Sequence, residues 1–181
     1  MATQTDVLSL SDLPLHPYLD ENGLVADRDV KGQVGVYAIF NDDRVLQYIG
    51  YSRNIALSLR QHLVRRPQQC HGFKVQTIDR PSRTILETIR QAWIVENGST
   101  PPGNSDDESS WSAPIDVKPR MTDEERKALE NAIDEQTRTK RLKSIARRVE
   151  SEILQELETR GVTEQLRFNP KLKETGLLDL K

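Results

Sequence analysis

The sequence predicts an α/β protein of the α+β type, in which a three-stranded antiparallel sheet flanked by helices precedes a long C-terminal helical extension. Three observations lead to this prediction. Short runs rich in β-branched and aromatic residues alternate with helix-like segments up to about residue 97. Residues 98–118 are rich in Gly, Ser, Pro, Asn and Asp, which is typical of a long, partly mobile loop. Residues 122–160 contain no Pro or Gly and consist mostly of helix formers.

Three strands are expected in the first half of the chain. Residues 35–40 (GVYAIF) and 45–49 (VLQYI) are apolar runs joined by a polar turn, which is the pattern of a β-hairpin. Residues 73–78 (FKVQTI) alternate apolar and polar side chains, as a half-buried strand does. These three segments form the predicted antiparallel sheet.

Two helices are expected between and after these strands. In the first, at 53–65, apolar residues recur every four positions, and Ser52 or Asn54 caps its start. The second begins at Ser82, a suitable cap, and ends before Gly98, a C-terminal signal. Both helices present one apolar stripe and therefore pack against the sheet.

The C-terminal segment is expected to form one long helix or two consecutive ones. Thr122 and Glu125 match a capping box. The apolar stripe thins between Ile133 and Ile145, where charged residues dominate, so a break or an exposed stretch is expected there. Docking of this segment on the core, and exposure of its stripe to a partner protein or a second copy, are both open interpretations.

The expected organisation has five parts. The 35% of hydrophobic and 30% of charged residues, with a net charge of −2, fit one modest core surrounded by solvated segments. The parts are an N-terminal extension at 1–30, the α+β domain at 31–105, a linker at 106–121, the helical segment at 122–160 and a tail at 161–181.

The composition also limits the compartment. No apolar run approaches the roughly 20 residues that cross a bilayer, and the first ten residues lack the features of a signal peptide. Cys70 is the one cysteine, which excludes an internal disulfide and a cysteine cluster for zinc. We therefore expect a cytoplasmic location and no membrane partner.

Positive charge is concentrated in the middle of the chain. Residues 51–90 hold eight Lys/Arg against two Asp/Glu, namely Arg53, Arg60, Arg65, Arg66, Lys74, Arg80, Arg83 and Arg90 against Asp79 and Glu87. Such a local excess attracts polyphosphate even when the whole chain is weakly acidic. A solvated helix face and a nucleic-acid footprint are both compatible with this distribution.

Two short motifs carry the strongest functional signal. Gly35-Val36-Tyr37 and Tyr48-Ile49-Gly50 are separated by ten residues and followed by a helix that contains His62. This pattern resembles the GIY-YIG nuclease family over roughly residues 30–105. The resemblance implies divalent-metal-dependent cleavage of DNA with Mg²⁺ or Mn²⁺.

The resemblance also implies roles for individual side chains. Tyr37 would activate the attacking water, and Tyr48 would orient water and phosphate. His62 lies where members of the family carry His or Tyr, and Asn104 matches an asparagine late in the pattern. The plainer interpretation is that both tyrosine rings fill a small core.

Two positions depart from the family pattern. Ser58 stands where active members place the arginine that neutralises the scissile phosphate. Arg60 lies about 200° further round the helix and does not replace it, whereas Arg53 can approach from the helix start.

The position of the metal-binding glutamate is occupied by Arg90 or Gln91. Glu87, one turn earlier, is the remaining candidate ligand, and its plainer interpretation is a solvated partner of Arg83 or Arg90. The sequence therefore assigns no metal site, and efficient cleavage is not expected.

A closer resemblance is to the N-terminal domain of plant chloroplast monothiol glutaredoxins and their cyanobacterial relatives. No glutaredoxin active-site motif follows the domain in this chain. The resemblance places Cys70 where that domain has a cysteine. It rests on Leu13-Pro14, Gly35 to Ala38, Ser52-Arg53, Ala56 to Leu63, Cys70, Gln91 to Ile94 and Pro101 to Asn104.

The environment of Cys70 leaves two interpretations open. His71, Arg65 and Arg66 are nearby cations that lower the pKa of a thiol, so a redox-responsive cysteine that forms a mixed disulfide with a separate glutaredoxin is one hypothesis. An inert, partly buried cysteine is the other.

The sequence thus yields two hypotheses of function. In the first, a nuclease-like protein binds DNA and cleaves it weakly or not at all, and the contacts are made by Arg53, Asn54, Arg60, Arg65, Arg66 and Asn104. In the second, the domain is a non-catalytic scaffold, and residues 122–160 bind a protein partner.

Overall fold

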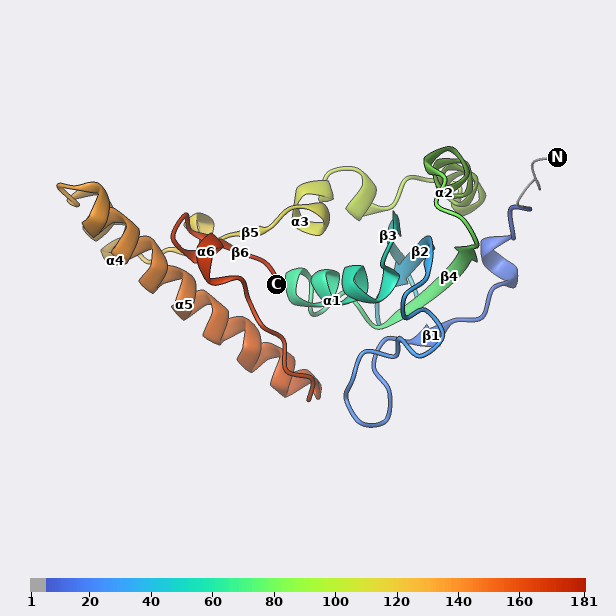
Figure 1. Ribbon diagram of the computed structural model, residues 1–181, viewed down its shortest axis with the longest axis horizontal. Helices are drawn as coiled ribbons and strands as arrows, with labels where there is room; N and C mark the ends of the chain where they lie inside the picture. The colour runs from blue at the N-terminus through green and yellow to red at the C-terminus, as the bar shows by residue number, and fades with distance from the viewer. Residues whose placement is uncertain (1–5) are drawn as a thin grey trace. The chain divides into compact units, whose positions relative to one another are not determined.

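The computed structural model describes residues 6–181, which divide after Ser112 into two compact units (Figure 1). The first unit contains an antiparallel sheet with two long helices, and the second contains the longest helix of the described chain. The α+β fold class predicted from the sequence is confirmed.

The sheet of the first unit has four antiparallel strands in the order β1-β4-β2-β3. The three expected strands are β2 (Val34–Phe40), β3 (Leu46–Ser52) and β4 (Gly72–Ile78). The additional strand, β1 (His16–Pro17), pairs with the outer edge of β4. Two residues are too short for an alternation of apolar and polar side chains, so the sequence gives no signal for this strand.

The two expected helices pack on opposite faces of this sheet. Helix α1 (Ile55–Arg65) begins after Asn54, whose Oδ1 accepts a hydrogen bond from the amide of Leu57 at 3.2 Å. It therefore starts two residues later than predicted, and Asn54 rather than Ser52 is the cap. Helix α2 (Arg83–Asn97) begins at the predicted cap Ser82.

Successive side chains along each strand point to opposite faces of the sheet, so they pack alternately against α2 and α1. Val36, Ala38 and Ile49 are fully buried against α2, where they form one hydrophobic cluster with Leu86, Ile89 and Trp93. The residues between them, including Tyr37, point to the face covered by α1. The two tyrosines of the motifs thus belong to the α1 face.

The N-terminal extension is fastened to α2. The Glu96 carboxylate accepts hydrogen bonds from the amides of Leu10 at 2.7 Å and Ser11 at 3.0 Å, at the short 3₁₀ turn η1 (Leu10–Asp12). The indole of Trp93 donates to the carbonyl of Leu8 at 2.9 Å. These contacts bury Leu10 in the core of the first unit.

The segment expected to be a loop contains short helical elements. They are η2 (Pro102–Asn104), α3 (Glu108–Ser112) and η3 (Lys118–Arg120), together with the two-residue strand β5 (Ile115–Asp116). Trp111 on α3 is 1% exposed. Burial of this one large ring orders a stretch whose composition is that of a loop, so the prediction of an irregular segment is wrong here.

The C-terminal segment consists of two consecutive helices, α4 (Asp123–Glu130) and α5 (Glu135–Arg160), which was one of the two predicted forms. The predicted capping box of Thr122 and Glu125 starts α4. The break lies at 131–134, because Asp134 caps a new helix that continues through the charged stretch. Between Ile133 and Ile145 the second expected form, an exposed stretch, is found, since most of residues 133–141 are exposed.

The tail adds structure to the second unit. Helix α6 (Pro170–Lys173) and strand β6 (Leu177–Leu178) follow α5, and β6 pairs antiparallel with β5. The apolar stripe of α5 is buried; its members are Leu142, Ile145, Ala146, Val149, Ile153 and Leu157. Within residues 6–181, none of the helices combines the length and the apolar character needed to cross a membrane.

Candidate functional site

An aromatic cluster on the α1 face unites the residues that the sequence singled out. The hydroxyl of Tyr37 on β2 lies 2.8 Å from Nε2 of His62 on α1. The ring of Tyr48 on β3 lies 4.7 Å from the His62 ring and 6.2 Å from the Tyr37 ring, between centroids. The three side chains assigned to catalysis by the resemblance are therefore in mutual contact.

Gly50 permits this arrangement. A Cβ atom at Gly50 would lie 2.6 Å from Cε1 of Tyr48 and 2.8 Å from the hydroxyl oxygen of Tyr37, which is closer than real Cβ contacts. Position 35 requires glycine for a different reason. A Cβ atom there would collide with the neighbouring β4 backbone, 2.9 Å from Cα of Thr77. One motif glycine thus makes room for the tyrosine rings, and the other allows close pairing of strands.

Burial holds the Tyr37–His62 pair in its neutral state. Both side chains are 3% exposed. Burial raises the pKa of Tyr37 well above its usual value, and the neighbouring Tyr48 adds to the effect. Burial, assisted by the positive charge of Arg65, lowers the pKa of His62 to about 3. Proton transfer from the phenol to the imidazole is therefore strongly uphill in this conformation, and no phenolate forms near neutral pH.

Trp111 closes the cluster. Its indole stacks on the Tyr48 ring with 5.3 Å between centroids and 6° between planes, and it lies 5.6 Å from the His62 ring. Its carbonyl accepts a hydrogen bond from Nη1 of Arg65 at 2.8 Å. Trp111 is not among the site residues predicted from the sequence; its one signal is that it is the sole aromatic residue of 98–118.

Three of the predicted nucleic-acid contacts are engaged within the protein. Nη1 of Arg60 lies 2.8 Å from the carboxylate of Asp27, and Arg65 donates to the Trp111 carbonyl. Arg66 is 3.9 Å from the carboxylate of Asp107. To bind a phosphate, each of these guanidinium groups must either leave its present partner or contact the partner and the phosphate at the same time.

The two predicted asparagine contacts have local backbone roles. Asn54 is exposed and caps α1. Asn104 is half-buried, and its amide exchanges two hydrogen bonds of 2.7 Å with the backbone N–H and C=O of Ile49. Asn104 thereby pairs with the open edge of β3 and fixes the segment that carries Trp111.

The position of the missing phosphate clamp is occupied by a small polar pair. The hydroxyl of Ser58 donates to Oγ of Ser52 at 2.8 Å. Arg60 is held by Asp27 and by the carbonyl of Ala56 at 3.0 Å, so it does not take over the role. Arg53 is exposed just before the α1 cap.

The carboxylate of Glu87 has the environment of an ion-pair partner. It accepts hydrogen bonds from Nη2 of Arg90 at 2.7 Å and from the amide of Gln91 at 3.0 Å, and these donors lower its pKa. A guanidinium beside the only candidate carboxylate does not fit a divalent cation. Nowhere in residues 6–181 do three or more His, Cys, Asp or Glu side chains form a group able to hold a metal ion.

Cys70 is fully buried at the end of the segment between α1 and β4. Its neighbour His71 lies 3.6 Å from the carboxylate of Asp42. A mixed disulfide at Cys70 requires local opening of the chain, because the attacking thiol must reach the sulfur directly.

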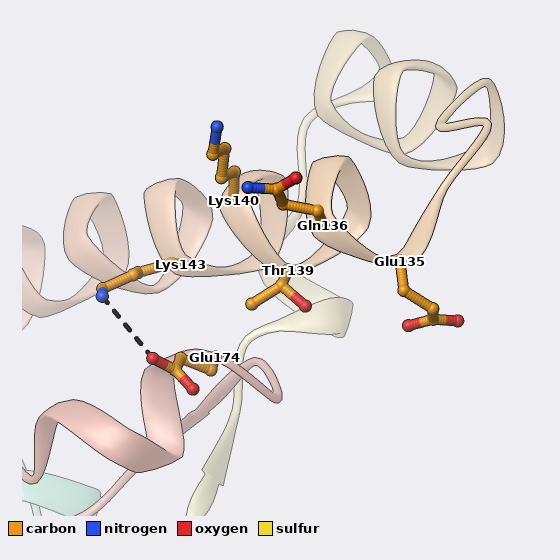
Figure 2. Close-up of a pocket in the computed structure, with 6 residues that line it drawn as sticks. All are labelled: Glu135, Gln136, Thr139, Lys140, Lys143 and Glu174. Atoms are coloured by element: carbon orange, nitrogen blue, oxygen red, sulfur yellow. Dashed lines mark ion pairs between the residues drawn. The ribbon is translucent and has the colours of Figure 1, made fainter.

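A shallow pocket lies in the C-terminal unit, between the start of α5 and the residue after α6. Figure 2 shows Lys143 facing Glu174, and their charged atoms are 3.7 Å apart. The six lining residues are Glu135, Gln136, Thr139, Lys140, Lys143 and Glu174. Two acidic and two basic groups balance one another, and the set contains no nucleophile–base pair.

Comparison with known proteins relates part of the chain to a plant protein. No family model matches the chain. The bifunctional monothiol glutaredoxin-S16 of Arabidopsis thaliana chloroplasts is 33% identical over 102 residues. The similar region is 54% of this chain and 33% of that protein, so the chain spans about a third of the relative's length. The similarity thus concerns one segment of a larger protein.

Proposed function

We propose that residues 31–105 form a GIY-YIG nuclease-like domain that binds nucleic acid and cleaves it weakly or not at all. The observation that carries the proposal is the cluster of Tyr37, Tyr48 and His62, with a 2.8 Å contact between Tyr37 and His62. The spacing of the two motifs and the order of strands and helices support the family resemblance. Similarity to a segment of a bifunctional plant glutaredoxin is compatible with it.

The environment of the cluster favours binding over cleavage. A tyrosine that activates water needs its phenolate within reach of the substrate, whereas Tyr37 is 3% exposed with a raised pKa. Ser58 supplies no positive charge, and Glu87 is bound by Arg90. Each missing electrostatic contribution is worth roughly 3–4 kcal/mol of transition-state stabilisation in enzymes that have it.

Exposed arginines support a role in binding. Arg53 and Arg83 are exposed, and neither guanidinium makes an ion pair or hydrogen bond with another of the described residues. Guanidinium groups in this state are available to phosphate oxygens. A backbone-directed contact of this kind is independent of base sequence.

Nucleic-acid binding and cleavage are tested together. We expect the full chain to bind a fluorescein-labelled 20-base-pair duplex with an affinity that falls steeply between 50 and 200 mM salt. We expect supercoiled plasmid to remain intact with Mg²⁺ or Mn²⁺, for both the wild type and Tyr37→Phe. Absence of binding at 50 mM salt contradicts the proposal, and nicking that is lost in Tyr37→Phe contradicts the loss of cleavage.

The alternative hypothesis, a scaffold whose residues 122–160 bind a protein partner, requires an exposed apolar stripe on that segment. The stripe of α5 is buried, and Ile133, 99% exposed, lies in the break between helices. This arrangement gives the alternative no support, so nucleic-acid binding is the function we propose.

A further inference from the structure

A second surface of the first unit has the composition of an anion site. A cavity of about 360 Å³ lies between the end of β3 and the start of α2. Its lining includes Tyr51, Ser52, Arg53, Ser82, Arg83 and Leu86. Tyr51 packs with the α2 cluster, whereas Tyr37 and Tyr48 belong to the opposite face of the sheet, so this cavity is distinct from the aromatic cluster.

The charge of the cavity is positive. Arg53 and Arg83 line it, and neither has a partner among the residues that the structure describes. No carboxylate lines the cavity. Glu87, one turn beyond Arg83, is occupied by Arg90 and Gln91. Two arginines therefore line this volume without a compensating charge.

The two serines of the cavity differ in where their hydroxyls lie. Ser52 Oγ accepts bonds from the amide of Asn54 at 2.9 Å and from the Ser58 hydroxyl at 2.8 Å, and is therefore directed toward α1. Ser82 Oγ accepts from the amide of Ile85 at 3.3 Å as the cap of α2. The Ser82 hydroxyl uses an oxygen lone pair in this bond and retains a hydrogen that it can donate.

One helix N-terminus adds to the positive potential. Helix α2, of 15 residues, begins at this cavity, where its cap Ser82 and its first residue Arg83 belong to the lining. The unpaired amides of a first helical turn and the helix dipole favour an anion. Arginine, serine hydroxyl and helix start together are the donor set that proteins use for phosphate.

We propose that this cavity binds a backbone phosphate of nucleic acid, with Arg53 and Arg83 on either side of it. This inference rests on the proposed function and specifies where the phosphate contact is made. The Tyr51 ring and Leu86 supply an apolar wall for the sugar attached to that phosphate, and the volume falls in the usual range of ligand sites. This phosphate contact does not involve the buried pair of Tyr37 and His62.

The site is tested first with inorganic phosphate on the ¹⁵N-labelled full chain. We expect saturable shifts of the amides of Ser52, Arg53, Ser82 and Arg83, compared with sodium chloride at equal ionic strength. The variant Arg53→Ala/Arg83→Ala loses this response. Arg80→Ala, which removes an exposed arginine that does not line the cavity, keeps it.

The same variants are then titrated with the labelled duplex. Loss of the contact with this one phosphate lowers the affinity about tenfold or more at low salt and reduces the magnitude of the log–log salt slope by about 1, whereas Arg80→Ala has a smaller effect on both. Duplex binding that is unchanged in the double variant overturns the phosphate site and leaves the proposed function standing. Phosphate binding without duplex binding keeps the site and overturns the proposed function.

Discussion

The contact between Tyr37 and His62 shows how burial changes the chemistry of a familiar pair. In water, a tyrosine and a histidine titrate about 3.5 pH units apart. Here the removal of both rings from water raises the pKa of the phenol and lowers that of the imidazole, so the gap widens. The pair therefore acts as a neutral hydrogen bond inside the domain.

His62 makes stability depend on pH. Its pKa is about 3 in the folded protein and ordinary, near 6.5, in the unfolded chain, so the unfolded state binds the extra proton between these values. The contribution is complete above about pH 6.5 and is lost as the pH falls. We expect His62 to decrease the free energy of unfolding by about 1.4 kcal/mol per pH unit below that point.

Urea unfolding of the wild type and of His62→Gln at pH 7, 6, 5 and 4.5 measures this effect. The difference between the two proteins removes the contribution of carboxylates such as Glu96, which titrate in the same direction. His16→Gln, at a half-buried position on β1, is the control and keeps the wild-type slope. Equal slopes for wild type and His62→Gln contradict the buried neutral histidine.

The residues of the site differ in how far the sequence predicts them. Tyr37, Tyr48 and His62 follow from short motifs at fixed spacing, because neighbouring strands and one helix bring them together. The partners of Arg60 and Arg66 cannot be predicted from such motifs. Asp27 and Asp107 are distant from them in sequence and come into contact with them only when the chain folds. A count of local charges therefore overestimates the positive potential that reaches solvent.

At the scale of elements, the segment with α3 shows the same limitation. Its composition predicts a loop, and its order comes from two tertiary contacts. Asn104 pairs with the edge of β3, and Gly103 allows close approach, because a Cβ there would lie 2.6 Å from the carbonyl of Gln47 and 2.8 Å from Trp111. By contrast, α1 and α2 carry their own caps and periodicity, and the sequence predicts them nearly to the residue.

Trp111 is expected to anchor this segment. Trp111→Ala leaves a large cavity beside Tyr48 and His62, and we expect it to lower the free energy of unfolding by about 3–5 kcal/mol. Guanidinium unfolding followed by circular dichroism measures the change. Ser110→Ala, at an exposed position of the same short helix, should stay within about 0.5 kcal/mol of the wild type. A loss below about 1 kcal/mol for Trp111→Ala shows that the stack contributes little.

The break between α4 and α5 illustrates a competition between two signals within an element. The thinning of the apolar stripe between Ile133 and Ile145 predicted a break or an exposed stretch, and the stretch is exposed but helical, because helix propensity and the cap at Asp134 set the boundary. Asp134 accepts a bond from the amide of Thr137 at 2.7 Å and starts a helix that crosses the charged stretch. Charged residues on one side of a helix are tolerated as long as the other side is buried.

For the whole molecule, the division after Ser112 separates two candidate surfaces for anions. The first unit has the Arg53 and Arg83 cavity. The second has basic residues on the exposed side of the first half of α5, namely Arg138, Lys140, Arg141 and Arg147. The weakly acidic total charge conceals both, and the sequence alone does not rank them.

Truncation of the chain shows which of the two surfaces binds nucleic acid more tightly. A chain ending at Ser112 retains the sheet, α1, α2 and Trp111, and we expect it to fold, as judged by dispersed amide signals and a cooperative thermal transition. We expect its affinity for the labelled duplex to stay within a factor of about 3 of the full chain, a change of about 0.7 kcal/mol. Residues 113–181 alone are the control and should bind at least about tenfold more weakly, because they lack the Arg53 and Arg83 cavity. If the affinity follows residues 113–181 instead, the basic side of α5 is the binding surface, and the assignment of nucleic-acid binding to the first unit is wrong.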